Sequence, residues 1–242
     1  MSLVYLVGTV HWDLRGPERL RKFLGFVRPT SIGIEASQEL IDSRLKFRKR
    51  VKAKLEEIRR SEELFSNLYD SLNLKKPEPK EDLVLKFLEI QSYEQWVPYE
   101  HKQEENPNVK IYPVHDNGFL SKRSPEVHRK ELGEEYIDEN GDAKLKFLED
   151  LGKENLEEFQ KEIDEAYRNN EFDYSKLIDV IKEADDIMEQ KIREVVKADP
   201  NGIVAVVSGA AHFFSGYGNN LYERLQDLSP HRVKLPEVDQ FK

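Results

Sequence analysis

Two short apolar runs, one near each end of the chain, stand out in a sequence that is otherwise strongly polar. The first stops at Gly8 and is followed by His11, and the second stops at Gly209 and is followed by His212. Continuous apolar runs of this length, bounded by glycine, are typical of strands buried on both faces of a parallel sheet. Because the carboxyl ends of such strands form the ligand-binding edge of an α/β sheet, the pattern predicts both histidines at one edge.

The residues after His11 have the pattern of a strand–helix–strand unit. Apolar residues recur at helical spacing from Pro17 until Pro29 stops the helix. The aliphatic run 31–36 then predicts a second buried strand that ends near Glu35. A right-handed crossover between parallel strands brings Glu35 to the same edge of the sheet as His11.

Two long charged stretches, at about 38–105 and 119–170, are predicted to be helical insertions that form a cap over this edge. Within them the pattern predicts a helix to about Leu74, a polar loop at 75–80 and a helix ending near Trp96-Val97-Pro98. The acidic part, 124–170, is predicted to be helical apart from a turn or short hairpin at 138–142.

The remaining pattern completes an α/β domain. Residues 109–116 are predicted to form a third strand, in which Pro113 indicates an edge position or a late bulge. Residues 174–197 are predicted to form a helix with one apolar stripe. A last edge strand is predicted at 232–235. The chain is therefore expected to be one α/β domain over residues 1–242, with a largely parallel central sheet flanked by helices.

Composition narrows the classes of function. The formal net charge of −9 argues against a nucleic-acid partner, and the basic run 44–60 is followed by glutamates at helical spacing, as on a solvated helix. The chain has no cysteine, so a thiolate metal site and thiol catalysis are excluded. Neither a membrane-spanning apolar stretch nor a signal peptide is visible, so we expect a cytoplasmic protein without a membrane partner.

His11, Glu35 and His212 are the candidate functional residues. Two neutral imidazoles and one carboxylate are the ligands expected of a catalytic zinc, manganese or cobalt site with one position open for water. The glycines Gly8 and Gly209 are predicted to let the backbone turn sharply and approach a ligand. With ordinary histidine pKa values, metal affinity should fall below about pH 6.5, and removal of His128 or His231 should change it little.

Neighbouring carboxylates have two interpretations. Asp13 and Asp116 could complete the metal coordination or orient a histidine from behind. Each residue also has an ordinary structural alternative: a strand-end histidine that bonds a loop, a surface glutamate, or an aspartate that caps a turn. The occurrence of the same Gly-x-x-His pattern after the two best strands is what favours the functional interpretation.

The order of these motifs resembles the TraB/PrgY/GumN/TIKI superfamily, and most of all its archaeal and bacterial TraB members. The resemblance is carried by Leu6-Val7-Gly8-Thr9-Val10-His11, Arg28-Pro29, Ile34-Glu35 and Val206-Val207-Ser208-Gly209-Ala210-Ala211-His212. It implies an α/β fold akin to erythromycin esterase and the haem-binding ChaN proteins, with functional roles for the two histidines and the glutamate. Asp116 resembles the aspartate of the family's middle strand.

The resemblance also implies activities. TIKI members are metal-dependent proteases, and PrgY-like members block a peptide pheromone. Many relatives carry an arginine on the helix before the last strand, where this chain has Ala184. Three functions follow as alternatives: a metal-dependent hydrolase acting on peptides, a metal-independent esterase with a histidine base, and a protein that binds a peptide, haem or another small molecule without catalysis.

Overall fold

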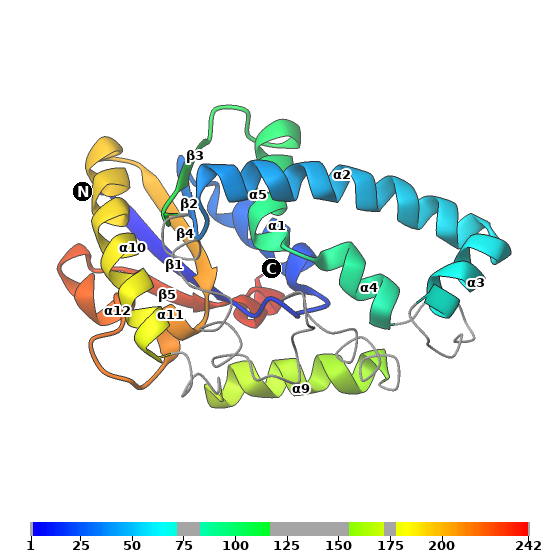
Figure 1. Cartoon of the computed structure of the whole chain (residues 1–242). Coiled ribbons are helices and arrows are strands. Elements are labelled where there is room, and N and C mark those ends of the chain that lie inside the picture. The colour runs from blue at the N-terminus through cyan, green and yellow to red at the C-terminus, as the bar shows by residue number, and fades with distance from the viewer. Residues whose placement is uncertain (1, 72–82, 117–154, 172–177, 242) are drawn as a thin grey trace.

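The computed structural model describes residues 2–71, 83–116, 155–171 and 178–241 of the chain (Figure 1). Its centre is a five-stranded sheet of order β3-β2-β4-β1-β5, in which all neighbouring strands are parallel. The strands are β1 (Leu3–Thr9), β2 (Ser31–Ile34), β3 (Lys110–Pro113), β4 (Ile203–Gly209) and β5 (His231–Lys234). The predicted α/β class is confirmed, and the two apolar runs are the neighbouring strands β1 and β4.

Helices flank this sheet. They are α1 (Gly16–Val27), α2 (Gln38–Arg60), α3 (Glu62–Ser71), α4 (Leu83–Ile90), α5 (Tyr93–Glu104), α9 (Leu156–Asn169), α10 (Ile178–Ala198), α11 (Ala211–Phe214) and α12 (Leu221–Arg224), with the short 3-10 helices η2 (Gln226–Leu228) and η3 (Leu235–Gln240). The predicted loop at 75–80 and turn at 138–142 lie outside the described residues. So does the first part of the helix predicted at 174–197.

The end of the helix predicted before Pro98 was wrong. The pattern placed this end near Trp96-Val97-Pro98, whereas the structure has two helices, α4 and α5, with a break between them at Ser92, where φ is 60°. Helix α5 then continues through Pro98 to Glu104. Ser92 ends α4 by adopting a left-handed conformation, which interrupts a helix without proline. This break matters because it directs the first residues of α5 toward the end of β1.

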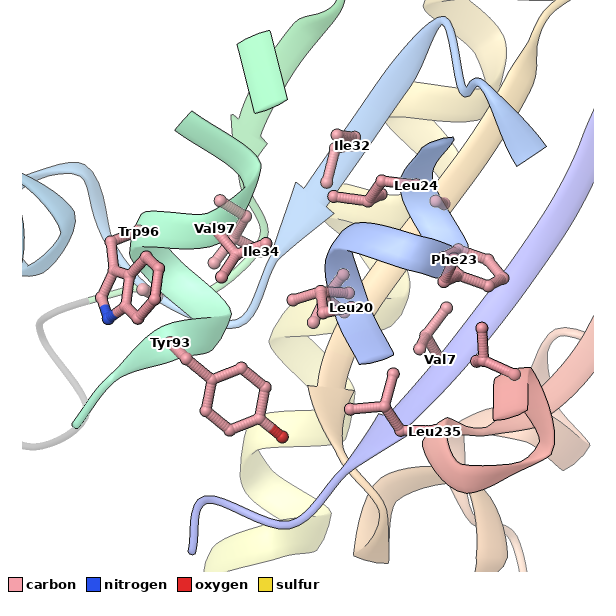
Figure 2. Close-up of a cluster of buried hydrophobic side chains, with 14 of the residues drawn as sticks. Val7, Leu20, Phe23, Leu24, Ile32, Ile34, Tyr93, Trp96, Val97 and Leu235 are labelled. Atoms are coloured by element: carbon pink, nitrogen blue, oxygen red, sulfur yellow. The ribbon is translucent and has the colours of Figure 1, made fainter. Parts of the chain in front are cut away.

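Side chains alternate across the sheet and bury both of its faces. Tyr5 and Val7 of β1 pack against α1, α5 and η3, whereas Val4 and Leu6 pack against α10, α11 and α12. Figure 2 shows the first of these layers, with Leu20 and other apolar residues of α1 lying between the strands and α5. The apolar stripe predicted for α10 fills the opposite layer. Two-sided burial is the reason for the continuous apolar runs in β1 and β4.

The outer strands agree with their sequence signals. The edge strand β3 ends at Pro113, in a position where a missing N–H removes no inner ladder bond. The other edge is β5, which pairs with β1 close to where the last strand was predicted. In Figure 1 the strands run toward α9, so that this helix lies beyond their carboxyl ends. Within the described residues, no helix is both long and apolar enough to cross a bilayer.

The long helix α2 begins at an N-cap, and this gives a first prediction. The hydroxyl of Ser37 accepts a hydrogen bond from the amide of Leu40 at 3.1 Å. Ser37→Ala should therefore lower the free energy of unfolding by about 1 kcal/mol. Ser43→Ala, on an exposed position inside α2, is the matched control and should change it by less than about 0.5 kcal/mol. Urea unfolding would measure both, and equal effects would contradict a capping role.

Candidate functional site

Three strand ends bring the predicted residues to one edge of the sheet. The register of β1 and β4 sets Thr9 opposite Gly209, so His11 and His212 follow neighbouring strands. On the other side of β4, β2 pairs in a register that sets Ile34 opposite Val207, and Glu35 is the next residue. Glu35 and His212 come into direct contact there, and His11 lies close enough for its charge to act on both.

Glu35 is held in a fixed orientation beside His212. One of its oxygens, Oε2, accepts hydrogen bonds from the hydroxyl of Ser208 at 2.6 Å and the amide of Gly209 at 2.8 Å. The other oxygen, Oε1, lies 3.1 Å from Nε2 of His212. The Glu35 side chain is 24% exposed and that of His212 is 6% exposed. The carboxylate therefore presents one oxygen to the imidazole while the strand end binds the other.

The second nitrogen of His212 is bound by a carboxylate that the sequence analysis did not single out. Asp185 of α10 is fully buried, and its Oδ1 lies 2.5 Å from Nδ1 of His212. The other oxygen of Asp185 accepts a hydrogen bond from the hydroxyl of Tyr217 at 2.6 Å. Asp185 directly follows Ala184, which is also buried.

His11 has an equivalent partner on a different helix. Oε1 of Glu94, the second residue of α5, lies 2.6 Å from Nδ1 of His11. The carboxylate of Glu94 is 4% exposed, while the imidazole is 59% exposed and reaches solvent. The hydroxyl of Thr9 donates to the Ser208 carbonyl at 3.1 Å and lies 3.3 Å from the same Glu94 oxygen. Each of the two histidines thus has its Nδ1 fixed by a buried helical carboxylate.

These contacts shift the ionisation of the site strongly. The charge of Glu94, together with its hydrogen bond to the ring, raises the pKa of His11 to about 9. Burial also opposes protonation of His212, but Glu35 and Asp185 raise its pKa to about 10. Burial would raise the pKa of Glu35, yet the two histidines and Ser208 hold it well below its ordinary range. At neutral pH the site therefore holds two imidazolium groups among three carboxyl groups.

The two aspartates predicted to support the site lie in different surroundings. Asp13 is fully buried, and its carboxylate binds Arg19, the amide of Arg15 and Gln160 rather than a histidine. Asp116 follows β3 at the same edge as Glu35 and is exposed. Its backbone carbonyl accepts a hydrogen bond from Nδ1 of His115 at 2.9 Å.

His115 is a further site residue that the sequence analysis passed over. It follows β3 next to β2, and its ring lies within electrostatic reach of Glu35 and His212. Burial lowers its pKa, so its imidazole is neutral at pH 7. Because Nδ1–H donates to a carbonyl, Nε2 carries the lone pair in the neutral ring. A neutral imidazole of this tautomer is a possible ligand or proton acceptor at the edge of the site.

The two glycines, Gly8 and Gly209, lie in the last residues of β1 and β4. Neither has a positive φ, since Gly218 is the single glycine with one among the described residues. A Cβ on Gly8 would lie 2.7 Å from the Phe214 ring, so this position is kept small by packing. Gly209 contributes its amide to Glu35. The predicted close approach of these glycines to a ligand stays a prediction.

Searches with the sequence against protein-family profiles and curated proteins, and with the structure against solved structures, found no match. Membership in the TraB superfamily therefore stays a prediction. Among the residues that the structure describes, no three histidine or carboxylate side chains converge closely enough, as they stand, to hold a metal ion. The site is defined by two histidine–carboxylate pairs at adjacent strand ends, with Glu35 in contact with His212.

Proposed function

We propose that this chain is a metal-dependent hydrolase in which His212, Glu35 and His11 bind a divalent zinc, manganese or cobalt ion. The observation that carries this proposal is the fixation of both histidines through Nδ1, by Asp185 and Glu94. Metal-binding histidines are typically held in this way, because the carboxylate fixes the ring and makes the other nitrogen a better ligand.

The donor atoms of His212 and Glu35 suit a shared ion. Their separation of 3.1 Å matches two ligands placed roughly 2.0–2.2 Å from one metal. Oε2 of Glu35 is already bound by Ser208 and Gly209, so Oε1 is the oxygen available for coordination. An ion bound there would supply Lewis acidity, which activates water as a nucleophile near neutral pH.

The residues of the chain itself would act in three ways. Asp185 and Glu94 would keep the imidazole rings oriented and accept a hydrogen bond from Nδ1–H of each ring. His115 would stand beside Glu35 as a neutral base. The peptide bond, as the class of substrate, rests on the resemblance to TIKI proteases alone.

A metal-independent esterase is the second candidate. The direct contact between Glu35 and His212, with Asp185 behind the ring, is also the arrangement of a histidine that exchanges protons with a substrate. A chelator separates the two candidates, because it would abolish the activity of a metal enzyme and leave that of a histidine base intact.

The proposal is tested by titrating zinc, manganese and cobalt into the metal-free protein by calorimetry at pH 8. We expect one ion to bind per chain, and hydrolysis of a mixed peptide library to depend on that ion. If the wild type binds none of the three metals, the metal-dependent function is refuted.

The supporting carboxylates give a sharper prediction. Asp185→Asn and Glu94→Gln should each weaken metal binding by about 10- to 100-fold, because an amide orients the ring less strongly than a carboxylate. Asp186→Asn, at the next residue of α10, is the matched control, since its side chain is 72% exposed and binds Arg224. Glu104→Gln, exposed on α5, serves the same purpose for Glu94. Equal affinity in Asp185→Asn and Asp186→Asn would contradict the assignment.

A further inference from the structure

The residue between Thr9 and His11 is held by two buried tyrosines from different helices. The backbone amide of Val10 donates a hydrogen bond to the hydroxyl of Tyr167, on α9, at 2.6 Å. The hydroxyl of Tyr93, the first residue of α5, donates to the carbonyl of Val10 at 3.1 Å. Both backbone groups of the residue that precedes His11 are therefore bound by side chains.

The two tyrosine side chains are buried together at this point. Tyr167 accepts a hydrogen bond from the Val10 amide, and Tyr93 donates one to the Val10 carbonyl, so one hydroxyl binds each backbone group of this residue. Tyr93 is 0% exposed and Tyr167 is 1% exposed. Burial raises the pKa of both, which keeps the two hydroxyls protonated and available for these hydrogen bonds.

Adjacent residues of α5 hold adjacent residues of the site. Tyr93 binds the Val10 carbonyl, and Glu94 binds Nδ1 of His11. Figure 2 shows the Tyr93 ring extending from α5, with its hydroxyl directed away from Trp96. Gly16 leaves the space for this ring, since a Cβ there would lie 2.4 Å from Cζ of Tyr93. The start of α5 is thus packed to reach the loop after β1.

The contribution from α9 is of a different kind. Tyr167 brings its hydroxyl across from a helix that lies beyond the strand ends (Figure 1). The same helix is tied to the loop after β1 by Gln160, which donates to Asp13 at 3.0 Å, and by Asp164, which binds Arg19 at 2.8 Å. Docking of α9 and the position of Val10 are therefore linked by direct contacts.

We propose that Tyr167 and Tyr93 are positioning residues for His11, and that Tyr167 couples the docking of α9 to ligand binding at the site. This inference rests on the proposed metal-binding function for the coupling, whereas the positioning stands on the hydrogen bonds alone. By linkage, a ligand that needs His11 in place must stabilise the docked α9 by the same factor as docking strengthens ligand binding.

The positioning is tested without any metal. Tyr167→Phe keeps the buried ring and removes the acceptor of the Val10 amide. Hydrogen exchange of the Val10 amide, followed by NMR, should accelerate at least about tenfold in this variant, because a buried amide without an acceptor opens more readily. Tyr93→Phe is a second variant with the same expectation for the loop 10–12. Tyr99→Phe, also on α5, is the control and should leave this exchange unchanged. Unchanged exchange in both variants would overturn the positioning role.

The coupling is tested with cobalt, whose visible spectrum reports its coordination. Tyr167→Phe should weaken cobalt binding by about tenfold, at the lower end of the range for groups that orient ligands. Cobalt should slow amide exchange along α9 in the wild type and in Tyr99→Phe, but not in Tyr167→Phe. A merely structural tyrosine would not remove this response. Equal slowing in Tyr167→Phe and in the wild type would overturn the coupling. If the wild type binds no cobalt, both the proposed function and the coupling are refuted. The exchange test without metal would still decide whether the tyrosines position His11.

Discussion

The affinity of the site for manganese should rise about 100-fold per pH unit between pH 7 and 8, because binding must displace two protons. The pKa values of about 9 for His11 and about 10 for His212 keep both rings protonated over this range. Only neutral imidazole is a ligand, so each displaced proton contributes a factor of about ten per pH unit. With the ordinary histidine pKa assumed from the sequence, metal affinity was expected to fall only below about pH 6.5. The carboxylate partners raise the histidine pKa values, so the fall is expected at higher pH.

Calorimetry in buffers of different ionisation enthalpy would count these protons directly. The single variants His11→Ala and His212→Ala should bind more weakly, since an open catalytic site has only three protein ligands, and their dependence should fall to about tenfold per unit. His231→Ala is the control: His231 begins β5, where a terminal loop was predicted, and it stacks on Tyr5 at 5.3 Å. An affinity that does not change between pH 7 and 8 would contradict both histidines as ligands.

Replacement of Arg19 by methionine should lower the free energy of unfolding by about 3–5 kcal/mol, the range for breaking a buried ion pair. Arg19 is 2% exposed and binds Asp13, Asp164 and Asp239 at 3.0, 2.8 and 2.8 Å. Asp13 is fully buried, and within the described part of the chain no cationic side chain other than Arg19 pairs with it. Urea unfolding of Arg19→Met would measure the loss.

Burial raises the pKa of Asp13 in the folded protein. A raised carboxyl pKa means that the folded state binds a proton more readily than the unfolded state, so protonation at low pH relieves the unpaired charge. The cost of Arg19→Met should therefore be smaller at pH 5 than at pH 8. Arg21→Met is the control, because Arg21 is 39% exposed, pairs with Glu100, and should cost about 1 kcal/mol or less. Equal losses in the two variants would contradict the special role of Arg19.

The sequence by itself determined the sheet and the placement of its strand ends. Both β1 and β4 are buried on two faces, so apolar residues follow one another in these runs and the strands are visible without alternation. Pro113 in β3, and the position of β5 near the end of the chain, indicated the two edge strands of the sheet. Since parallel strands end at one edge of a sheet, Glu35 and His212 could be expected there together, and the structure brings them into contact.

Only the tertiary structure decided which groups hold these residues. Glu94 lies 83 positions from His11, and Asp185 lies 27 positions from His212. Asp185 does fall on the apolar stripe of α10, at helical spacing from Ile181 and Met188, which indicates its burial. Which histidine each carboxylate contacts depends on how α5 and α10 pack against the sheet. Asp13 stands two residues after His11, but its carboxylate binds Arg19 in a buried ion pair and contacts neither histidine of the site. Spacing along the chain places backbone elements, whereas the partners of a buried charge are selected by contacts that form only when distant helices pack.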